Sequence, residues 1–326
     1  MSLYRKILAQ AWKNTWTNKY LWLFGLFATL LSSSGELNLL FRGFGDVPEQ
    51  GLFPGLRGLW STGLFSATTA SNFGKIMITD SFSLMMALTI LVIGFMMFCL
   101  IVWFSTISQA GLVYNYSRII SNKSHDLKSG IDVGIKNFWP VFTFNLLLKA
   151  IVYVIFLIVA APIVLWFVNQ SFFQNVFFFF AYIIFIPASI VVAFIAKYAI
   201  CYAVIKGEKI REALILGWEL FLKNWLVSLE MAFILFGVSF LATLCFILCS
   251  AAFAIIFLFI SFLLSLLINI VNVNLILYCS LIIFIFLIVL VGSILSTFMI
   301  SSWTGLFVEL LNKGGVSKIV RIFDKK

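Results

Sequence analysis

The side chains that could perform chemistry in this sequence are few and scattered. The chain has one histidine, His125, which stands beside Asp126 in a polar segment. A hydrolytic or metal site needs a second base or ligand at a suitable spacing, and the sequence offers none near His125. The five cysteines lie in apolar runs without the C-x-x-C spacing of a metal site. We therefore expect no catalytic residue, no metal and no cofactor, and we favour a non-enzymatic protein over an enzyme.

Two charged residues inside long apolar runs, Lys149 and Glu230, form the candidate intramembrane polar site. Ionisable groups in hydrocarbon cost energy and are often functional. Lys149 lies ten residues beyond Trp139, which is roughly 15 Å along a helix. We expect Lys149 and Glu230 to approach each other inside the bundle and to neutralise one another. The alternative is that each is an interfacial charge on a tilted helix.

The apolar composition determines the class of protein. The 326 residues are 63% hydrophobic and 10% charged, with 38 phenylalanines, and the mean hydropathy is +1.13. An average soluble domain carries about 25% charged and about 45–50% apolar residues. A soluble fold could not cover so much apolar surface, so we predict an all-α, polytopic integral membrane protein. It should have about six transmembrane helices and amphipathic interfacial helices on the cytoplasmic side.

Apolar runs of about 20 residues place the predicted spans. The single membrane domain, residues 1–326, should contain an interfacial helix (1–19), a non-cytoplasmic loop (36–80) and spans at 20–35, 82–108, 138–168, 176–205, 225–268 and 275–307. Two points stay open. The first run also fits a signal peptide that is cleaved. Residues 225–268 are long enough for one helix, for one span with a surface segment, or for two spans.

The basic residues determine the predicted orientation of the chain. The formal net charge is +10, with 22 Lys and Arg residues. With six spans, 17 of the 22 lie on the side that holds both termini, three lie on the opposite side, and Lys149 and Lys197 lie inside spans. Cytoplasmic loops of membrane proteins collect Lys and Arg. We therefore predict a multi-pass protein with cytoplasmic termini, and we do not attribute the excess charge to a nucleic-acid partner.

A short pattern recurs before three of the predicted spans. Its copies are Lys13-Asn14-Thr15-Trp16, Lys136-Asn137-Phe138-Trp139 and Lys223-Asn224-Trp225. Upstream of each, apolar residues at spacings of three and four predict an amphipathic helix. Lys and Trp both favour the headgroup region, so the predicted interfacial anchors are Lys13, Trp16, Lys136, Trp139, Lys223 and Trp225. The predicted repeat unit is an in-plane helix, an outward span and a return span; chance recurrence is the alternative.

The same residues carry a resemblance to a known group of proteins. Ala11-Trp12-Lys13-Asn14, followed by residues 20–27, resembles the start of a broad group of bacterial membrane proteins, and residues 212–218 with Lys223-Asn224-Trp225 are similar to its internal repeat. This group includes the membrane domain fused to some glycerophosphodiester phosphodiesterases. The resemblance implies a helical protein of the bacterial cytoplasmic (inner) membrane. It implies no phosphodiesterase activity, which belongs to a separate soluble domain.

Two functions are consistent with these patterns. The interfacial helices favour a membrane scaffold, an assembly partner or a lipid-interacting protein. Membrane lipids are then the expected partners, while a membrane-protein partner or self-association stays open. The alternative is a transporter or permease subunit with a polar site near Lys149, which the internal repeat favours. A cavity that leads from Lys149 to one membrane face would distinguish the transporter from the scaffold.

Overall fold

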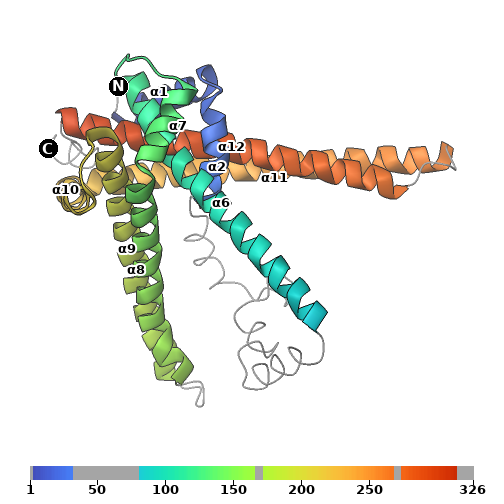
Figure 1. The fold of residues 1–326 in the computed structure, drawn as a ribbon, viewed down its shortest axis with the longest axis horizontal. Helices are drawn as coiled ribbons and strands as arrows, with labels where there is room; N and C mark the ends of the chain where they lie inside the picture. The colour runs from blue at the N-terminus through green and yellow to red at the C-terminus, as the bar shows by residue number, and fades with distance from the viewer. Residues whose placement is uncertain (1–2, 32–80, 166–171, 268–272, 314–326) are drawn as a thin grey trace. The chain divides into compact units, whose positions relative to one another are not determined.

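The computed structural model describes residues 3–31, 81–165, 172–267 and 273–313, and this part of the chain contains helices and turns but no strand. The helices are α1 (Leu3–Thr17), α2 (Leu21–Leu31), α6 (Ser81–Ile120), α7 (Leu127–Lys136), α8 (Phe138–Leu165), α9 (Phe172–Cys201), the π-helix η1 (Tyr202–Lys206), α10 (Ile210–Lys223), α11 (Trp225–Leu267) and α12 (Val273–Lys313) (Figure 1). The predicted loop at 36–80 lies outside the described residues.

Five stretches of helix in this part of the chain are long and apolar enough to cross a membrane. They are Leu91–Ile120, Phe138–Ile155, Phe185–Lys206, Trp225–Phe257 and Ile282–Asn312. The first predicted span, 20–35, is described only as far as Leu31, and its helix α2 has 11 residues. The prediction of an all-α, polytopic membrane protein is confirmed.

Several helices extend past the predicted ends of the spans. Helix α6 continues to Ile120 and α12 to Lys313, whereas the predicted spans end at residues 108 and 307. Tyr116 on α6 and Leu310 on α12, which lie in these extra turns, are buried. Contacts inside the protein therefore stabilise helix beyond the apolar run that faces lipid.

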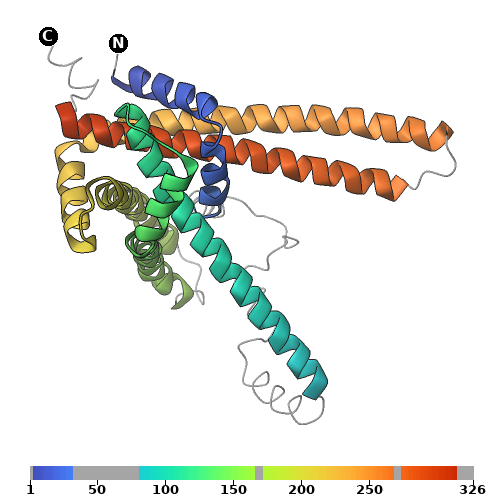
Figure 2. The same ribbon diagram turned by 45° about the horizontal axis from the view of Figure 1, so that its top comes forward.

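Two pairs of long helices form hairpins. Helix α11 is one uninterrupted helix of 43 residues, which is the first of the three arrangements that the sequence left open. It runs alongside α12, and α8 runs alongside α9 (Figures 1 and 2). Most large apolar side chains along α11 are exposed, as expected for a surface that faces lipid.

The chain divides into two compact units, residues 1–31 with 104–326 and residues 32–103. In the second unit, the described part is the first half of α6, where Leu91, Phe95 and Phe98 are exposed. An apolar helix surface of this kind suits contact with lipid chains.

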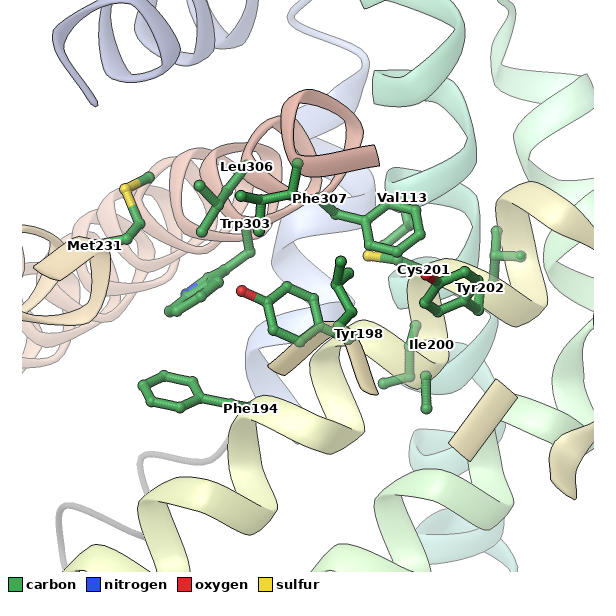
Figure 3. Close-up of a cluster of buried hydrophobic side chains, with 14 of the residues drawn as sticks. Val113, Phe194, Tyr198, Ile200, Cys201, Tyr202, Met231, Trp303, Leu306 and Phe307 are labelled. Atoms are coloured by element: carbon green, nitrogen blue, oxygen red, sulfur yellow. The ribbon is translucent and has the colours of Figure 1, made fainter. Parts of the chain in front are cut away.

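The core of the first unit lies where the ends of α9, α11 and α12 meet (Figure 3). The ring of Tyr198 on α9 lies 6.4 Å from Trp303 and 6.3 Å from Phe307, both on α12. Its hydroxyl lies 2.6 Å from Ser228 Oγ on α11. Aromatic pairs at such distances contribute about 0.5–1.5 kcal/mol beyond the area they bury. Tyr198 therefore joins all three helices at one point.

Helix α2 packs closely against α12 through Gly25. A Cβ atom at Gly25 would overlap Thr297 Oγ1 and the carbonyl oxygen of Ser293. Ser293 Oγ donates a hydrogen bond to the Trp22 carbonyl, and Thr297 Oγ1 shares its proton between the Ser293 carbonyl at 2.8 Å and the Leu21 carbonyl at 3.2 Å. A small residue thus permits backbone approach, and hydroxyl groups then bond across the interface.

We predict that Gly25→Ala lowers the thermal stability of the protein in detergent, because the added methyl group would overlap α12. The matched control is Gly237→Ala in α11, where nothing lies within 4 Å of an added Cβ. Alanine is the better helix former by about 1 kcal/mol, so the control should equal or exceed the wild type. The measurement is the temperature at which half of the monodisperse protein is lost. Equal midpoints for Gly25→Ala and the wild type would contradict the close approach.

Candidate functional site

We call α1, α7 and α10 the lead-in helices, because each directly precedes an apolar helix. Each ends at an asparagine, the elbow residue, whose Nδ2 donates to the carbonyl four residues earlier: Asn18 to Asn14 (3.3 Å), Asn137 to Val133 (2.9 Å) and Asn224 to Leu220 (3.2 Å). The same carbonyls also accept the backbone N–H of the elbow residue. The side-chain amide therefore adds a second donor to a carbonyl that already has its backbone partner, at the point where the helix ends.

The structure changes the register of the first repeat copy. The sequence pattern aligned Asn14 with Asn137 and Asn224, but Asn18, one turn later, makes the equivalent contact. Seven residues before each elbow stands a small, buried residue: Ala11, Gly130 or Gly217. The motif Lys13-Asn14 matches the other copies better in sequence, so only the hydrogen bonds reveal the structural register.

Glycines bring α7 and α10 close to neighbouring helices. A Cβ at Gly134 of α7 would lie 2.5 Å from the carbonyl oxygen of Ile107 on α6. A Cβ at Gly217 of α10 would lie 3.1 Å from the backbone nitrogen of Ala199 on α9. Both distances are shorter than ordinary van der Waals contact. The two lead-in helices are therefore docked backbone to backbone, which fixes their rotation about their own axes.

Four of the predicted anchors lie on the exposed faces of the lead-in helices, and the other two, Trp139 and Trp225, lie at the starts of α8 and α11. All six are exposed: Lys13, Trp16, Lys136, Trp139, Lys223 and Trp225. Trp139 is 69% exposed and Trp225 is 54% exposed. Trp12 and Trp218 are also exposed. Exposed indole rings beside lysines suit the headgroup region of a bilayer, where the ring is half in an apolar environment.

A row of aromatic rings fixes α1 to its neighbours. The ring of Trp16 lies 5.6 Å from Trp12 and 5.3 Å from Trp22 on α2, and Trp12 lies 5.8 Å from Phe298 on α12. All three contacts are edge-to-face, a preferred arrangement of aromatic pairs. Trp22 Nε1 also donates to the Thr15 carbonyl at 2.8 Å. The row thus presents indole surface on a rigid support.

Tyr4 holds Glu230, the acidic member of the predicted polar site. The Tyr4 hydroxyl on α1 donates a hydrogen bond to Glu230 Oε2 on α11. A bond to a charged group contributes about 1.5–3 kcal/mol. Lys6 forms an ion pair with Glu309 on α12 at 3.8 Å, but it is largely exposed, and such pairs contribute little. Helix α1 therefore reaches both α11 and α12 through polar contacts.

The structure does not bring Lys149 and Glu230 into an ion pair. The Lys149 side chain is exposed on α8, and no ion pair involves it in the part of the chain that the structure describes. One turn earlier, Asn145 Nδ2 donates to Gln109 Oε1 on α6 at 2.7 Å. Lys149 thus continues a polar row that begins with two uncharged amides. These amides gave no charge signal in the sequence, so their association was not foreseen.

An aromatic ring accommodates the second intramembrane cation, Lys197. Its Nζ lies 4.7 Å from the centre of the Trp303 ring on α12. An ammonium group over an indole face gains about 0.5–2 kcal/mol from the cation–π interaction, with the larger values in desolvated sites. Lys197 therefore contributes to the core as well as carrying charge.

His125 has a structural role in the described residues. Its Nδ1 lies 2.8 Å from the Tyr20 hydroxyl, and the two rings stack at 6.0 Å. The phenol hydroxyl can donate to Nδ1. Asp126 itself caps α7, and no group of three or more His, Cys, Asp or Glu residues that could hold a metal occurs in the described ranges.

We predict that Tyr4→Phe destabilises the protein by about 1.5–3 kcal/mol, because Glu230 loses a donor while the ring packing is kept. The control is Tyr153→Phe on α8, whose side chain is 57% exposed and should tolerate the change. In a Glu230→Leu background, Tyr4→Phe should cost little or nothing. Thermal midpoints in detergent measure all three. Additive losses in the double variant would show that the hydrogen bond does not contribute.

No family model, curated protein or solved structure matches the chain. The resemblance to the membrane domain of some glycerophosphodiester phosphodiesterases therefore stays a prediction from sequence.

Proposed function

We propose that this protein is a non-enzymatic, lipid-interacting scaffold of a bacterial cytoplasmic membrane, with both termini on the cytoplasmic side. The observation that carries the proposal is the exposed lysine and tryptophan at the end of each lead-in helix. The distribution of Lys and Arg supports the orientation. The sequence resemblance alone supports the bacterial setting.

The docking of the lead-in helices favours stable binding of anionic headgroups. Each lysine near an anionic surface contributes about 1 kcal/mol of attraction, and indole rings prefer the same depth of the bilayer. The buried faces of α7 and α10 are held by backbone contacts at Gly134 and Gly217. Lys136 and Lys223, at the ends of these two helices, are therefore presented before any lipid binds, beside Trp139 and Trp225 at the starts of α8 and α11. This lowers the entropic cost of binding.

We predict that the protein prefers phosphatidylglycerol over phosphatidylcholine, and that the variant Lys13→Gln/Lys136→Gln/Lys223→Gln loses much of this preference. Loss of one lysine should weaken binding at its own site by about fivefold, the equivalent of about 1 kcal/mol. The measurement is the fraction of motionally restricted spin-labelled lipid at the protein in reconstituted vesicles of both compositions.

A matched triple variant tests whether position matters as well as charge. Lys123, Lys128 and Lys209 are also exposed, but no tryptophan neighbours them in the sequence. The variant Lys123→Gln/Lys128→Gln/Lys209→Gln loses the same charge and should keep most of the preference. If both triple variants lose it equally, net charge alone attracts the lipids and the lead-in sites are not specific.

The row Gln109, Asn145 and Lys149 is the observation that favours the alternative, a transporter with a polar site at Lys149. We predict that Lys149→Cys, in a chain whose native cysteines are replaced, reacts no faster with a membrane-impermeant maleimide than Leu146→Cys. Leu146 lies three residues earlier on α8 and is 56% exposed, so it is the matched position. Selective labelling at position 149 in vesicles would reveal a hydrated path and favour the transporter.

A further inference from the structure

Lys149 differs from the two other charged side chains that lie deep in apolar runs. Glu230 receives the hydrogen bond from Tyr4, and Lys197 lies over the Trp303 ring. Lys149 is exposed, and it forms no hydrogen bond or ion pair with the residues that the structure describes. Ionisable groups inside membranes almost always pair with one another or with backbone carbonyls. The described part of the single chain therefore leaves the surroundings of Lys149 incomplete.

The depth of Lys149 makes this exposed charge costly. Trp139, at the start of α8, is 69% exposed and suits the headgroup region. Ten residues of helix separate it from Lys149, roughly 15 Å, which is half of a hydrocarbon core of about 30 Å. With α8 near the membrane normal, the ammonium group lies near the middle of the bilayer. Lysines reach the headgroups by snorkelling from positions near helix ends, whereas Lys149 lies about three turns from the nearer end of α8.

Lys149 borders an exposed face of α8. Leu146, Ala150 and Tyr153 follow one another at spacings of three and four, so they share this side of the helix, and all three are exposed. On the other side of Lys149, Asn145 contacts α6 through its hydrogen bond. Ala150 is small and permits the close approach of a second helix. The exposed face thus combines apolar side chains, a small residue and one cation.

We propose that this face of α8 binds a transmembrane helix of another protein, and that an Asp or Glu side chain of that helix pairs with Lys149. The ammonium group carries a positive charge and three hydrogen-bond donors, and a carboxylate complements both. A cation and a carboxylate are each costly when they are exposed to hydrocarbon, so their pairing removes both costs. The proposed surface does not include the lysines of the lead-in helices, so this proposal and that of lipid binding can fail separately.

The acidic residues of this chain indicate that the partner is not a second copy. Of the Asp and Glu residues in the sequence, only Glu230 lies well inside an apolar run, and Glu230 already receives the Tyr4 hydrogen bond. It lies five residues beyond Trp225, roughly 8 Å along the helix, and therefore at a shallower depth than Lys149. A second copy thus offers no matching carboxylate.

Binding of a synthetic transmembrane helix tests the proposal. The probes are two leucine–alanine peptides that differ only at the central residue, Glu or Gln. Energy transfer from a dye on the full-length protein to a dye on the peptide, in phosphatidylcholine vesicles, measures binding. We expect the wild type to bind the Glu peptide several times more tightly than the Gln peptide, and Lys149→Met to bind both equally. The matched control, Lys128→Met, removes an exposed lysine of α7 and should keep the preference.

Charge reversal provides a second variant in case Lys149→Met does not fold. Lys149→Glu should prefer a peptide with a central Lys over the Glu peptide. Equal binding of the Glu and Gln peptides by the wild type, or an unchanged preference in Lys149→Met, would overturn the proposal. If equal binding is accompanied by a weaker preference for phosphatidylglycerol in Lys149→Met, the lysine reaches the headgroups and its partner is an anionic lipid, which would also overturn it.

Discussion

Helices in a bilayer gain little from burying one apolar side chain against another, because the lipid chains are equally apolar. Their association in this protein depends on backbone approach at small residues. Gly25 brings α2 to α12, Gly134 brings α7 to α6, and Gly217 brings α10 to α9. The aromatic core around Tyr198 lies where helix ends meet (Figure 3). Beyond it, α11 has few buried residues and many exposed apolar side chains.

Because the surroundings are apolar, charged and polar side chains need partners within the protein. Glu230 receives a phenol hydrogen bond, and Lys197 lies over an indole ring. Both partners are aromatic side chains. Each has an apolar ring that suits these surroundings, together with a group that interacts with a charge: the hydroxyl of Tyr4 and the ring face of Trp303. The hydroxyl groups of α12 bond instead to backbone carbonyls of α2. These contacts of Glu230, Lys197, Ser293 and Thr297 join helices that are remote in sequence, so they hold the arrangement of helices as well as satisfying individual groups.

The sequence predicted those features that depend on local pattern. Apolar runs gave the all-α class, and α8 and α11 begin at the predicted residues, Phe138 and Trp225. Features that depend on tertiary contact were missed. Tyr4 and Glu230 are 226 residues apart. The periodic pattern of apolar residues along a helix does not indicate contacts between residues so far apart in the sequence. The sequence also could not show that Asn18, and not Asn14, is the first elbow, because that assignment depends on a side-chain hydrogen bond.

The single-residue elbows restrict how these segments can change during evolution. One asparagine separates α7 from α8, and one separates α10 from α11. An α-helix turns by about 100° per residue. An inserted or deleted residue between Gly134 and Asn137 would therefore rotate the glycine face of α7 away from α6 by about that angle. The exposed faces can exchange one residue type for another, whereas the length of each segment is fixed. In related chains, we expect gaps to fall outside the stretch from the small residue to the elbow.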